Sequence, residues 1–294
     1  MMADMAELSR RSLLRIGAGA AATAAGAYAL GMNLSRSEET ARAISMTSVG
    51  APLAPPGAAP TYVTGSFVSQ ARGGVPTNWV IARPPGQTGP LRTVIALHGQ
   101  DSDAAMVMEG IDQSLAKAVE AGLPPFAVAA ADGGGMCYWH KRASGEDSGA
   151  MVLDEFIPML ASQGLDTSRI GFWGWSMGGY GALLLGARLG PAKTTAICAV
   201  SPALWNSADD ATPGAFDSAD DYAANSVWGL PALGSIPIRI DCGDDDPFIS
   251  ATKPFIAQLP HGAAGGFSPG GHNAEFWGSQ QDAEAAWLAP LVVA

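Results

Sequence analysis

Ser176 lies in the pentapeptide G-W-S-M-G at positions 174–178, which follows an apolar aromatic run and precedes a segment rich in Gly, Ala and Leu. This order predicts a strand, a tight turn and a helix, which is the context in which a G-x-S-x-G serine acts as a nucleophile. Gly174 and Gly178 would relieve crowding around the turn, and the helix would direct free N–H groups and a positive dipole at the hydroxyl. The spacing therefore predicts Ser176 as a nucleophile.

A second G-x-S-x-G match spans positions 266–270, and it fails on chemistry. The residue after the nucleophile must donate its N–H to an oxyanion, and Pro269 has no N–H. No helical pattern follows this match either. We interpret it as a Gly/Pro turn.

A serine nucleophile needs a base that takes its proton and an acid that orients the base. On this kind of scaffold the chain order is serine, acid, histidine. Of the four histidines, His98 and His140 precede Ser176, which leaves His261 and His272. His272 lies in a Gly-rich loop before a helical segment, from which an imidazole could reach over a sheet, whereas His261 follows a helix end and fits a solvated loop. We expect His272 to be the base.

The acid is expected at positions 238–248, where a short apolar strand ends in a turn of Gly and carboxylates. Three consecutive aspartates follow Gly243, and two of them would be solvated turn residues. The G-x-x-D-P spacing favours Asp246, with Asp245 as the alternative. The run lacks the Gly and the distal Glu of a calcium loop, so we expect no metal site here.

An oxyanion hole needs two N–H donors. The Met177 N–H supplies one, and the loop after an earlier strand supplies the other. The segment 93–101 reads as a buried strand that breaks at His98-Gly99, which makes the Gln100 N–H the second donor. We expect His98 to pack and hydrogen-bond under this loop.

Two long segments, 132–148 and 201–235, interrupt the expected alternation of strands and helices and carry many aromatic residues. They predict a substrate pocket rimmed by aromatic side chains, with Trp139 and Trp205 as candidates, although aromatics also anchor long loops to a core. Trp277 is a further candidate, and we expect it to pack behind the His272 loop.

Four blocks of sequence, taken as a set, carry a resemblance to a known family: L-H-G-Q (97–100), G-W-S-M-G-G-Y-G-A (174–182), I-D-C-G-D-D-D-P (240–247) and G-G-H-N-A-E-F-W (270–277). They resemble the esterase D and antigen 85 (mycolyltransferase) group of the α/β-hydrolases over about residues 61–294. The resemblance implies a triad of Ser176, Asp246 and His272, with Met177 and Gln100 as oxyanion donors. Mycolyltransferases tend to carry Asp where this chain has His98, so the resemblance favours the esterase branch.

The coarse element pattern supports the same fold class. Strands are expected at 61–71, 77–83, 93–97, 126–131, 194–200, 236–241 and 266–267, with a further strand before the elbow, and helices at 103–120, 149–162, 249–259 and 274–292, with a further helix from the elbow to Leu189. The first two strands would form an antiparallel hairpin. The later alternation of strands and helices predicts an α/β domain, an α/β-hydrolase fold with a mostly parallel central sheet and helices on both faces.

The N-terminal part of the chain reads as a targeting segment. Arg10-Arg11 begins a twin-arginine pattern that is followed by a weakly apolar Ala/Gly stretch, so residues 1–43 are expected to be an export signal that directs a bacterial protein to the periplasm, the cell wall or the exterior. Residues 44–60 read as a Pro/Ala-rich linker. Residues 61–294 then suit a single α/β domain, and any membrane contact would come through an uncleaved signal.

Composition limits the partners. The hydrophobic share of 48% and charged share of 15% suit a large core, and a net charge of −11 without a Lys/Arg cluster argues against nucleic acid or anionic lipid. Three cysteines cannot make a disulfide framework, although export would permit one bridge, for which Cys137 and Cys242 are the candidates. No cofactor is implied.

These features predict an exported serine esterase that acts on small-molecule or lipid esters, or thioesters, through an acyl-enzyme on Ser176. An acyltransferase that passes the acyl group to a sugar or alcohol is the alternative within the same chemistry. A non-catalytic cell-wall binding protein on the same fold is the alternative of a different class. The sequence leaves the acyl length and the oligomeric state open.

Overall fold

The computed structural model describes residues 61–294, and the expectations for the twin-arginine segment (1–43) and the linker (44–60) lie outside the described residues. Eight strands form one sheet in the order β1-β2-β4-β3-β5-β6-β7-β8. The strands are β1 (Tyr62–Ser69), β2 (Val75–Ala82), β3 (Arg92–Leu97), β4 (Ala127–Ala131), β5 (Asp166–Trp175), β6 (Thr194–Val200), β7 (Ile238–Gly243) and β8 (Ala264–Ser268).

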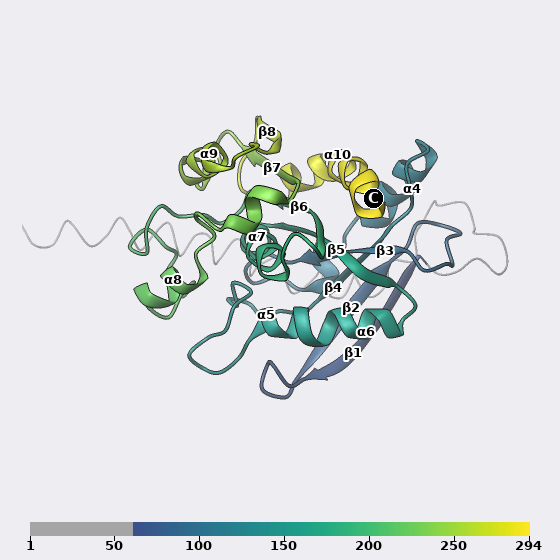
Figure 1. Cartoon of the computed structure of the whole chain (residues 1–294), viewed down its shortest axis with the longest axis horizontal. Coiled ribbons are helices and arrows are strands. Elements are labelled where there is room, and N and C mark those ends of the chain that lie inside the picture. The colour runs from purple at the N-terminus through teal and green to yellow at the C-terminus, as the bar shows by residue number, and fades with distance from the viewer. Residues whose placement is uncertain (1–60) are drawn as a thin grey trace, which may run out of the picture. The chain divides into compact units, whose positions relative to one another are not determined.

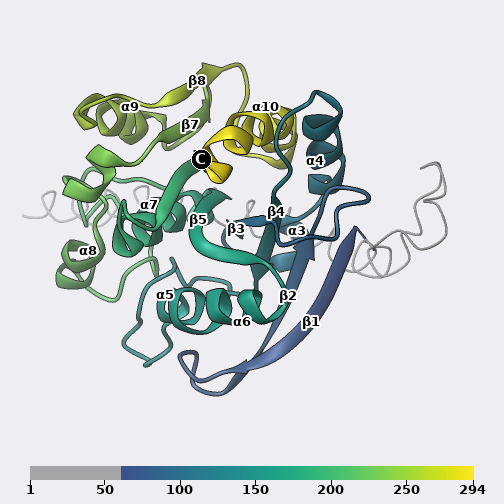
Figure 2. The same cartoon turned by 45° about the vertical axis from the view of Figure 1, so that its right-hand side comes forward.

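β1 and β2 pair as the predicted antiparallel hairpin at one edge of the sheet, and β2 continues antiparallel to β4 (Figure 2). The hairpin turns at Gly73 and Gly74, whose φ values of 75° and 83° are readily reached only without a side chain. All other neighbouring strands are parallel. The carboxyl ends of the parallel strands therefore lie along one edge, where ligands bind in open α/β sheets.

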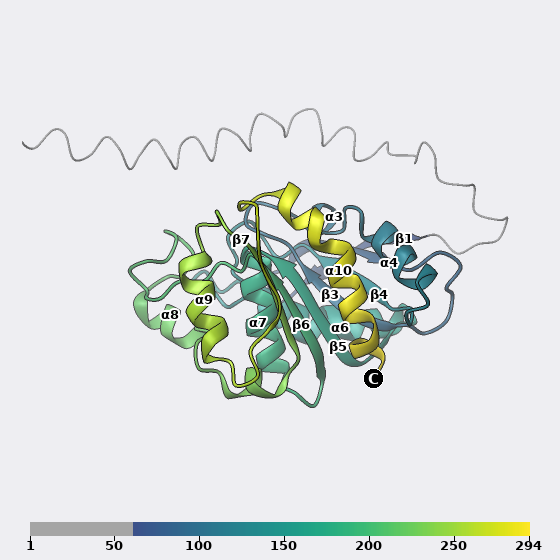
Figure 3. The same cartoon turned by 90° about the horizontal axis from the view of Figure 1, so that it is seen from above.

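Helices cover both faces of the sheet, as predicted (Figure 1). They are α3 (Ala104–Val107), α4 (Ile111–Glu120), α5 (Ser148–Ala150), the π-turn η1 (Met151–Phe156), α6 (Ile157–Ser162), α7 (Met177–Leu189), α8 (Ala219–Asn225), the 3₁₀ turn η2 (Pro231–Ser235), α9 (Ile249–Gln258) and α10 (Ala274–Val293). One core lies between the sheet and the α6, α7 and α9 side. A second core lies between the sheet and α3, α4 and α10, with α10 running along the strands β5 and β6 (Figure 3).

Two expected helices differ from the structure. The helix expected over 103–120 is split into α3 and α4, because Gly110 adopts a left-handed φ of 75° and caps the start of α4. The helix expected over 149–162 contains the π-turn η1. In addition, the long segment 201–235 holds the short helix α8, which begins at a Ser218 cap.

The bridge considered between Cys137 and Cys242 is not formed, and all three cysteines are buried free thiols. The topology explains this difference. Three strands separate β4 from β7, so at about 4.8 Å between neighbouring strands these two strands lie about 19 Å apart, and Cys137 packs against Gly133 directly after β4 while Cys242 lies in β7. Two Cα atoms more than about 7 Å apart cannot be bridged.

Within residues 61–294, none of the helices is both long enough and apolar enough to cross a lipid bilayer.

Candidate active site

Ser176 occupies a sharp turn between β5 and α7. Its backbone has φ 56° and ψ −121°, a conformation that side-chain-bearing residues rarely adopt and that a tightly held turn can impose. The turn is fixed by hydrogen bonds from the Ser176 N–H to the Val200 carbonyl (2.9 Å) and from the Ala203 N–H to the Ser176 carbonyl (3.0 Å). The strained turn projects the serine side chain away from the strand.

Gly174 and Gly178 are required by the closeness of the backbone. A Cβ at Gly174 would lie 2.6 Å from the carbonyl oxygens of Gly178 and Leu97, and a Cβ at Gly178 would collide with the Leu97 carbonyl. The obstacles are main-chain atoms, which cannot rotate away. The structure thus gives both elbow glycines the steric role expected of them.

The structure brings Ser176, His272 and Asp246 into one hydrogen-bonded chain. The Ser176 hydroxyl lies 2.8 Å from His272 Nε2, and His272 Nδ1 lies 2.8 Å from Asp246 Oδ2. With the Nδ1 proton donated to the carboxylate, Nε2 is free to accept the serine proton. This is the geometry by which an imidazole activates a hydroxyl nucleophile.

Asp246 is buried in the loop that follows β7, and both of its carboxylate oxygens have partners that fix the orientation of the side chain. Its Oδ1 accepts the Phe248 N–H (2.8 Å), and its Oδ2 faces His272. Burial opposes ionisation, but the hydrogen bond and charge of His272 and the Phe248 N–H outweigh it and hold the pKa of the Asp246 carboxyl below its usual value. Asp246 therefore stays an anion at neutral pH.

The loop that carries Asp246 is joined by main-chain hydrogen bonds to the loop that carries His272. The Asp244 N–H donates to the Ser268 carbonyl, and the Asp245 N–H donates to the Gly270 carbonyl, each at 2.9 Å. Both loops leave parallel neighbours, β7 and β8, at the same edge of the sheet. Acid and base are thereby held in register by backbone atoms.

The alternatives left open by the sequence lie outside this chain of hydrogen bonds. Asp244, Asp245 and His261 are exposed. His140 is fully buried against Phe216 at 5.2 Å between ring centroids. The structure therefore favours Asp246 over Asp245 and His272 over His261.

The two N–H groups predicted to bind an oxyanion lie near the elbow without an acceptor among the described residues. Met177 is the first residue of α7, so its N–H has no partner within the helix. The β3–α3 loop approaches the serine closely, since a Cβ at Gly99 would lie 3.6 Å from Ser176 Cβ. Gln100 follows directly, and among residues 61–294 no hydrogen-bond acceptor engages its N–H or that of Met177.

His98 holds this loop from below. Its Nε2 accepts the Gly133 N–H (2.8 Å), so the ring proton sits on Nδ1, which faces the Gly99 carbonyl at 2.8 Å. Complete burial lowers the pKa of His98, which keeps the ring neutral in this arrangement. His98 thus has the supporting role expected from the sequence.

Of the three tryptophans proposed for the pocket, Trp139 does not line it, and that prediction is wrong. Its side chain is fully buried beneath the loop, against the α7 backbone at Gly181 and against His98 (5.0 Å between ring centroids). It is a core residue because α7 presents a glycine where the indole packs. Trp277 packs beside the base, at 5.1 Å from His272, as expected for a residue behind that loop.

Trp205 belongs to an aromatic cluster built from the two long segments. Its ring lies 5.5 Å from Tyr138, 5.8 Å from Phe216 and 5.6 Å from Phe248. Phe248 in turn contacts the His272 ring at 5.1 Å. The cluster therefore extends to the base and forms an apolar wall beside it.

Two aromatic residues were missed by the sequence reasoning: Phe248, which contacts the base, and Trp175, which contacts Trp277. Phe248 lies two residues after Asp246, and Trp175 stacks on Trp277 at 5.3 Å with the rings 9° from parallel. The sequence feature that could have found them is their position, since Phe248 follows the predicted acid by two residues and Trp175 directly precedes the predicted nucleophile. His272 thus sits between Phe248 and Trp277, which limits the rotation of its ring.

Asp246→Asn is expected to lower kcat for an ester by about 10³- to 10⁴-fold, because an amide can hold His272 in the wrong tautomer. The matched control is Asp245→Asn, which removes an exposed carboxylate from the same turn. The measurement is steady-state hydrolysis by both variants. Equal losses in the two variants would contradict the assignment of the acid.

Comparison with known proteins addresses the fold. No model of a known protein family matches the sequence, and no curated protein matches it. The chain is similar in structure to a ferulic acid esterase, with 18% identity, a TM-score of 0.65, and coverage of 80% of this chain and 98% of that one.

Similar values are found for S-formylglutathione hydrolases. That of Staphylococcus aureus shares 18% identity over 79% of this chain and 99% of its own, with a TM-score of 0.61. That of Agrobacterium tumefaciens shares 18% identity over 79% of this chain and 95% of its own, with a TM-score of 0.60. With its mostly parallel eight-stranded sheet and its nucleophile-elbow turn, residues 61–294 adopt the α/β-hydrolase fold.

Proposed function

We propose that this chain is a serine esterase that hydrolyses carboxylic esters or thioesters through an acyl-enzyme on Ser176. The observation that carries the proposal is the hydrogen-bonded chain from Ser176 through His272 to the buried Asp246, set on a strained elbow. The names of the structural neighbours, a ferulic acid esterase and S-formylglutathione hydrolases, support hydrolysis of ester and thioester bonds.

The proposed first step forms the acyl-enzyme. His272 Nε2 takes the proton of the Ser176 hydroxyl as its oxygen attacks the acyl carbon, and Asp246 stabilises the resulting imidazolium. The Met177 and Gln100 N–H groups stabilise the oxyanion, each lowering the barrier by about 3–4 kcal/mol. His272 then returns the proton to the departing alcohol or thiol.

In the second step, His272 takes a proton from water, whose oxygen attacks the acyl carbon and releases the acid. The proton passes back to Ser176, so the enzyme ends as it began. An alcohol or sugar in place of water would convert the same acyl-enzyme into an acyltransferase. The two outcomes differ only in the acceptor and are separated by product analysis.

The proposal includes export. The twin-arginine pattern at Arg10-Arg11 supports transport of the folded chain out of the bacterial cytoplasm. All three cysteines of the chain are buried free thiols, so the described fold uses no disulfide for its stability. Such a domain could fold in the reducing cytoplasm before transport.

The test is hydrolysis of a p-nitrophenyl ester series from acetate to palmitate by the full chain, together with a fluorophosphonate label located by mass spectrometry. We expect turnover, a chain-length optimum and the label on Ser176. Turnover that rises with added glycerol or glucose, with the acyl product on the sugar or alcohol, would point to a transferase. No turnover and no label would favour a binding protein and overturn the proposal.

A further inference from the structure

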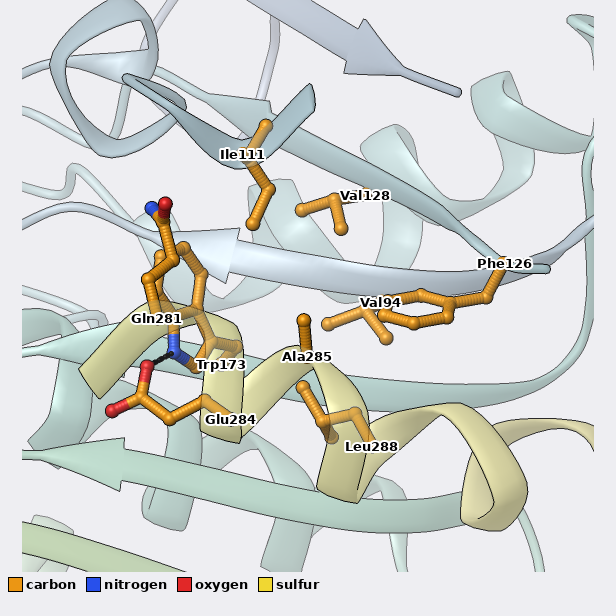
Figure 4. Close-up of a pocket in the computed structure, with 9 residues that line it drawn as sticks. All are labelled: Val94, Ile111, Phe126, Val128, Trp173, Gln281, Glu284, Ala285 and Leu288. Atoms are coloured by element: carbon orange, nitrogen blue, oxygen red, sulfur yellow. Dashed lines mark hydrogen bonds between the residues drawn. The ribbon is translucent and has the colours of Figure 1, made fainter. Parts of the chain in front are cut away.

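Glu284 is a buried acid on the face of the sheet opposite α7, in the middle of α10. Only 1% of the residue is exposed. Its Oε2 accepts the Trp173 Nε1–H at 2.8 Å, and its Oε1 has no hydrogen-bond partner within residues 61–294 (Figure 4). A buried carboxylate with one donor is poorly solvated, so this group needs an explanation.

Within residues 61–294, the cation beside Glu284 is Arg239, which is already paired. The Arg239 guanidinium on β7 donates to both carboxylate oxygens of Asp241, at 2.6 and 3.1 Å. Cys198 on β6, Asp241 and Glu284 each place a ligand-type atom within 4.8 Å of the others. Among the described residues, these three and Arg239 are the charged or titratable groups that face this point of α10.

Most other neighbours of Glu284 are apolar, and the amide of the polar neighbour Gln281 is bonded to Ser114 and to the Glu109 carbonyl. A small cavity beside Glu284 is lined mainly by hydrocarbon side chains from β3, β4, α4 and α10, which are Val94, Ile111, Phe126, Val128, Ala285 and Leu288 (Figure 4). Such walls offer no hydrogen bonds to an ionised carboxylate. Burial, with the Asp241 charge in addition, raises the pKa of Glu284 to about 8.

A protonated Glu284 fits these contacts better than a carboxylate does. Its Oε2 accepts from Trp173, and an O–H on Oε1 would face the Asp241 carboxylate. A divalent cation fits less well, because it would have to share Asp241 with the Arg239 guanidinium. The charges then balance without further groups: Arg239 neutralises Asp241, and the acid and the thiol are uncharged.

The cluster joins the three elements that deliver the triad. Trp173 lies on β5, three residues before Ser176, and Asp241 lies on β7, five residues before Asp246. The helix of Glu284, α10, begins two residues after His272. A hydrogen-bonded group at this point therefore ties nucleophile, acid and base to one another from beneath the sheet.

We propose that Glu284 is a positioning residue of the active site, held as a neutral acid that links β5 and β7 to α10. Its effect on catalysis rests on the proposed function, whereas its protonation state does not. When Glu284 loses its proton, two carboxylates share this interior with one guanidinium, and the link between α10 and β7 weakens.

The test compares wild type with Glu284→Gln, a neutral isostere that can accept from Trp173 and donate to Asp241. Glu275→Gln, which alters an exposed acid on the same helix, is the matched control. Thermal and denaturant unfolding of the full chains is followed between about pH 4 and 10, and kcat and KM are measured for a p-nitrophenyl ester over the same range.

The raised pKa of Glu284 determines how the stability of the fold depends on pH. The pKa of Glu284 is raised from 4.5 in the unfolded chain to about 8 in the folded one. Its stabilising contribution is therefore complete below about pH 4.5, declines as the pH rises through the window, and is lost above about pH 8. We expect the folding equilibrium constant of wild type, relative to Glu284→Gln, to fall by about tenfold per pH unit across that window. The Glu275→Gln chain should follow wild type.

For catalysis, we expect Glu284→Gln to keep kcat within about threefold of wild type at neutral pH. Above about pH 8, wild-type kcat should fall relative to the variant while KM stays the same. Parallel pH profiles of wild type and Glu284→Gln would overturn the proposal, as would a Gln variant that does not fold. A stoichiometric divalent metal that is present in wild type and lost in the variant would also overturn it.

The unfolding data decide the protonation state even if wild type hydrolyses no ester. Failure of the proposed function would appear only in the ester assay.

Discussion

Ser176→Ala is expected to lower kcat/KM for ester hydrolysis by about 10³- to 10⁶-fold, because the acyl-enzyme can no longer form. Residual turnover would come from the oxyanion donors, Met177 and Gln100, acting on water. Folding should be little affected, since the bonds that hold the elbow run through the main chain of residue 176. The measurement is steady-state hydrolysis of the best p-nitrophenyl ester, with a thermal melt of each chain.

The chain supplies its own control for this variant. Ser268 is the central residue of the second G-x-S-x-G match and lies at the end of β8, so Ser268→Ala removes a serine of the same local pattern. It should retain wild-type turnover. A Ser176→Ala variant with the activity of Ser268→Ala would show that another group performs the chemistry.

Gly178→Ala is expected to destabilise the fold by about 3 kcal/mol or more, because the added methyl group meets the Leu97 main chain and neither can move alone. The expected result is a large fall in the denaturant midpoint, or no soluble protein. Since the clash pushes the elbow away from the β3–α3 loop, any folded fraction should also lose activity.

Gly278→Ala is the matched control. Gly278 also lies in a helix, α10, but a Cβ there would meet no atom within 4 Å. This substitution is expected to raise stability by about 0.5–1 kcal/mol, the usual gain of alanine over glycine in a helix. Equal effects in the two variants would contradict the steric role of Gly178.

Most of the candidate site could be predicted from the sequence because each of its residues lies in a short segment with a recognisable pattern. Ser176, Asp246 and His272 each lie in a turn whose pattern is visible within about ten residues, and the parallel topology gathers such turns at one edge. The strand at 194–200 was predicted with its observed bounds for a similar reason, since a short β-branched run between turns fits a central strand.

The structure departs from the sequence predictions where contacts between distant parts of the chain determine burial or where one backbone conformation ends a helix. Trp139 became a core residue because Gly181, forty-two residues later, leaves room for its indole. No local pattern marks Glu284 as buried, and only the packing of α10 against β5, β6 and β7 removes it from solvent. The break at Gly110 depends on a single left-handed glycine, which the surrounding helical pattern conceals.

The paired loops after β7 and β8 have a consequence for engineering. Because their main chains are bonded to each other at Asp244 and Asp245, they can be transplanted or varied only as a unit, and an insertion in either would shift the proton relay. The segments 132–148 and 201–235 share no such bonds with that unit among those described. Diversified libraries aimed at a new substrate range belong in these two segments, outside residues 133–135, which bond the β3–α3 loop and His98, and outside residues 201–203, which bond β7 and the elbow turn.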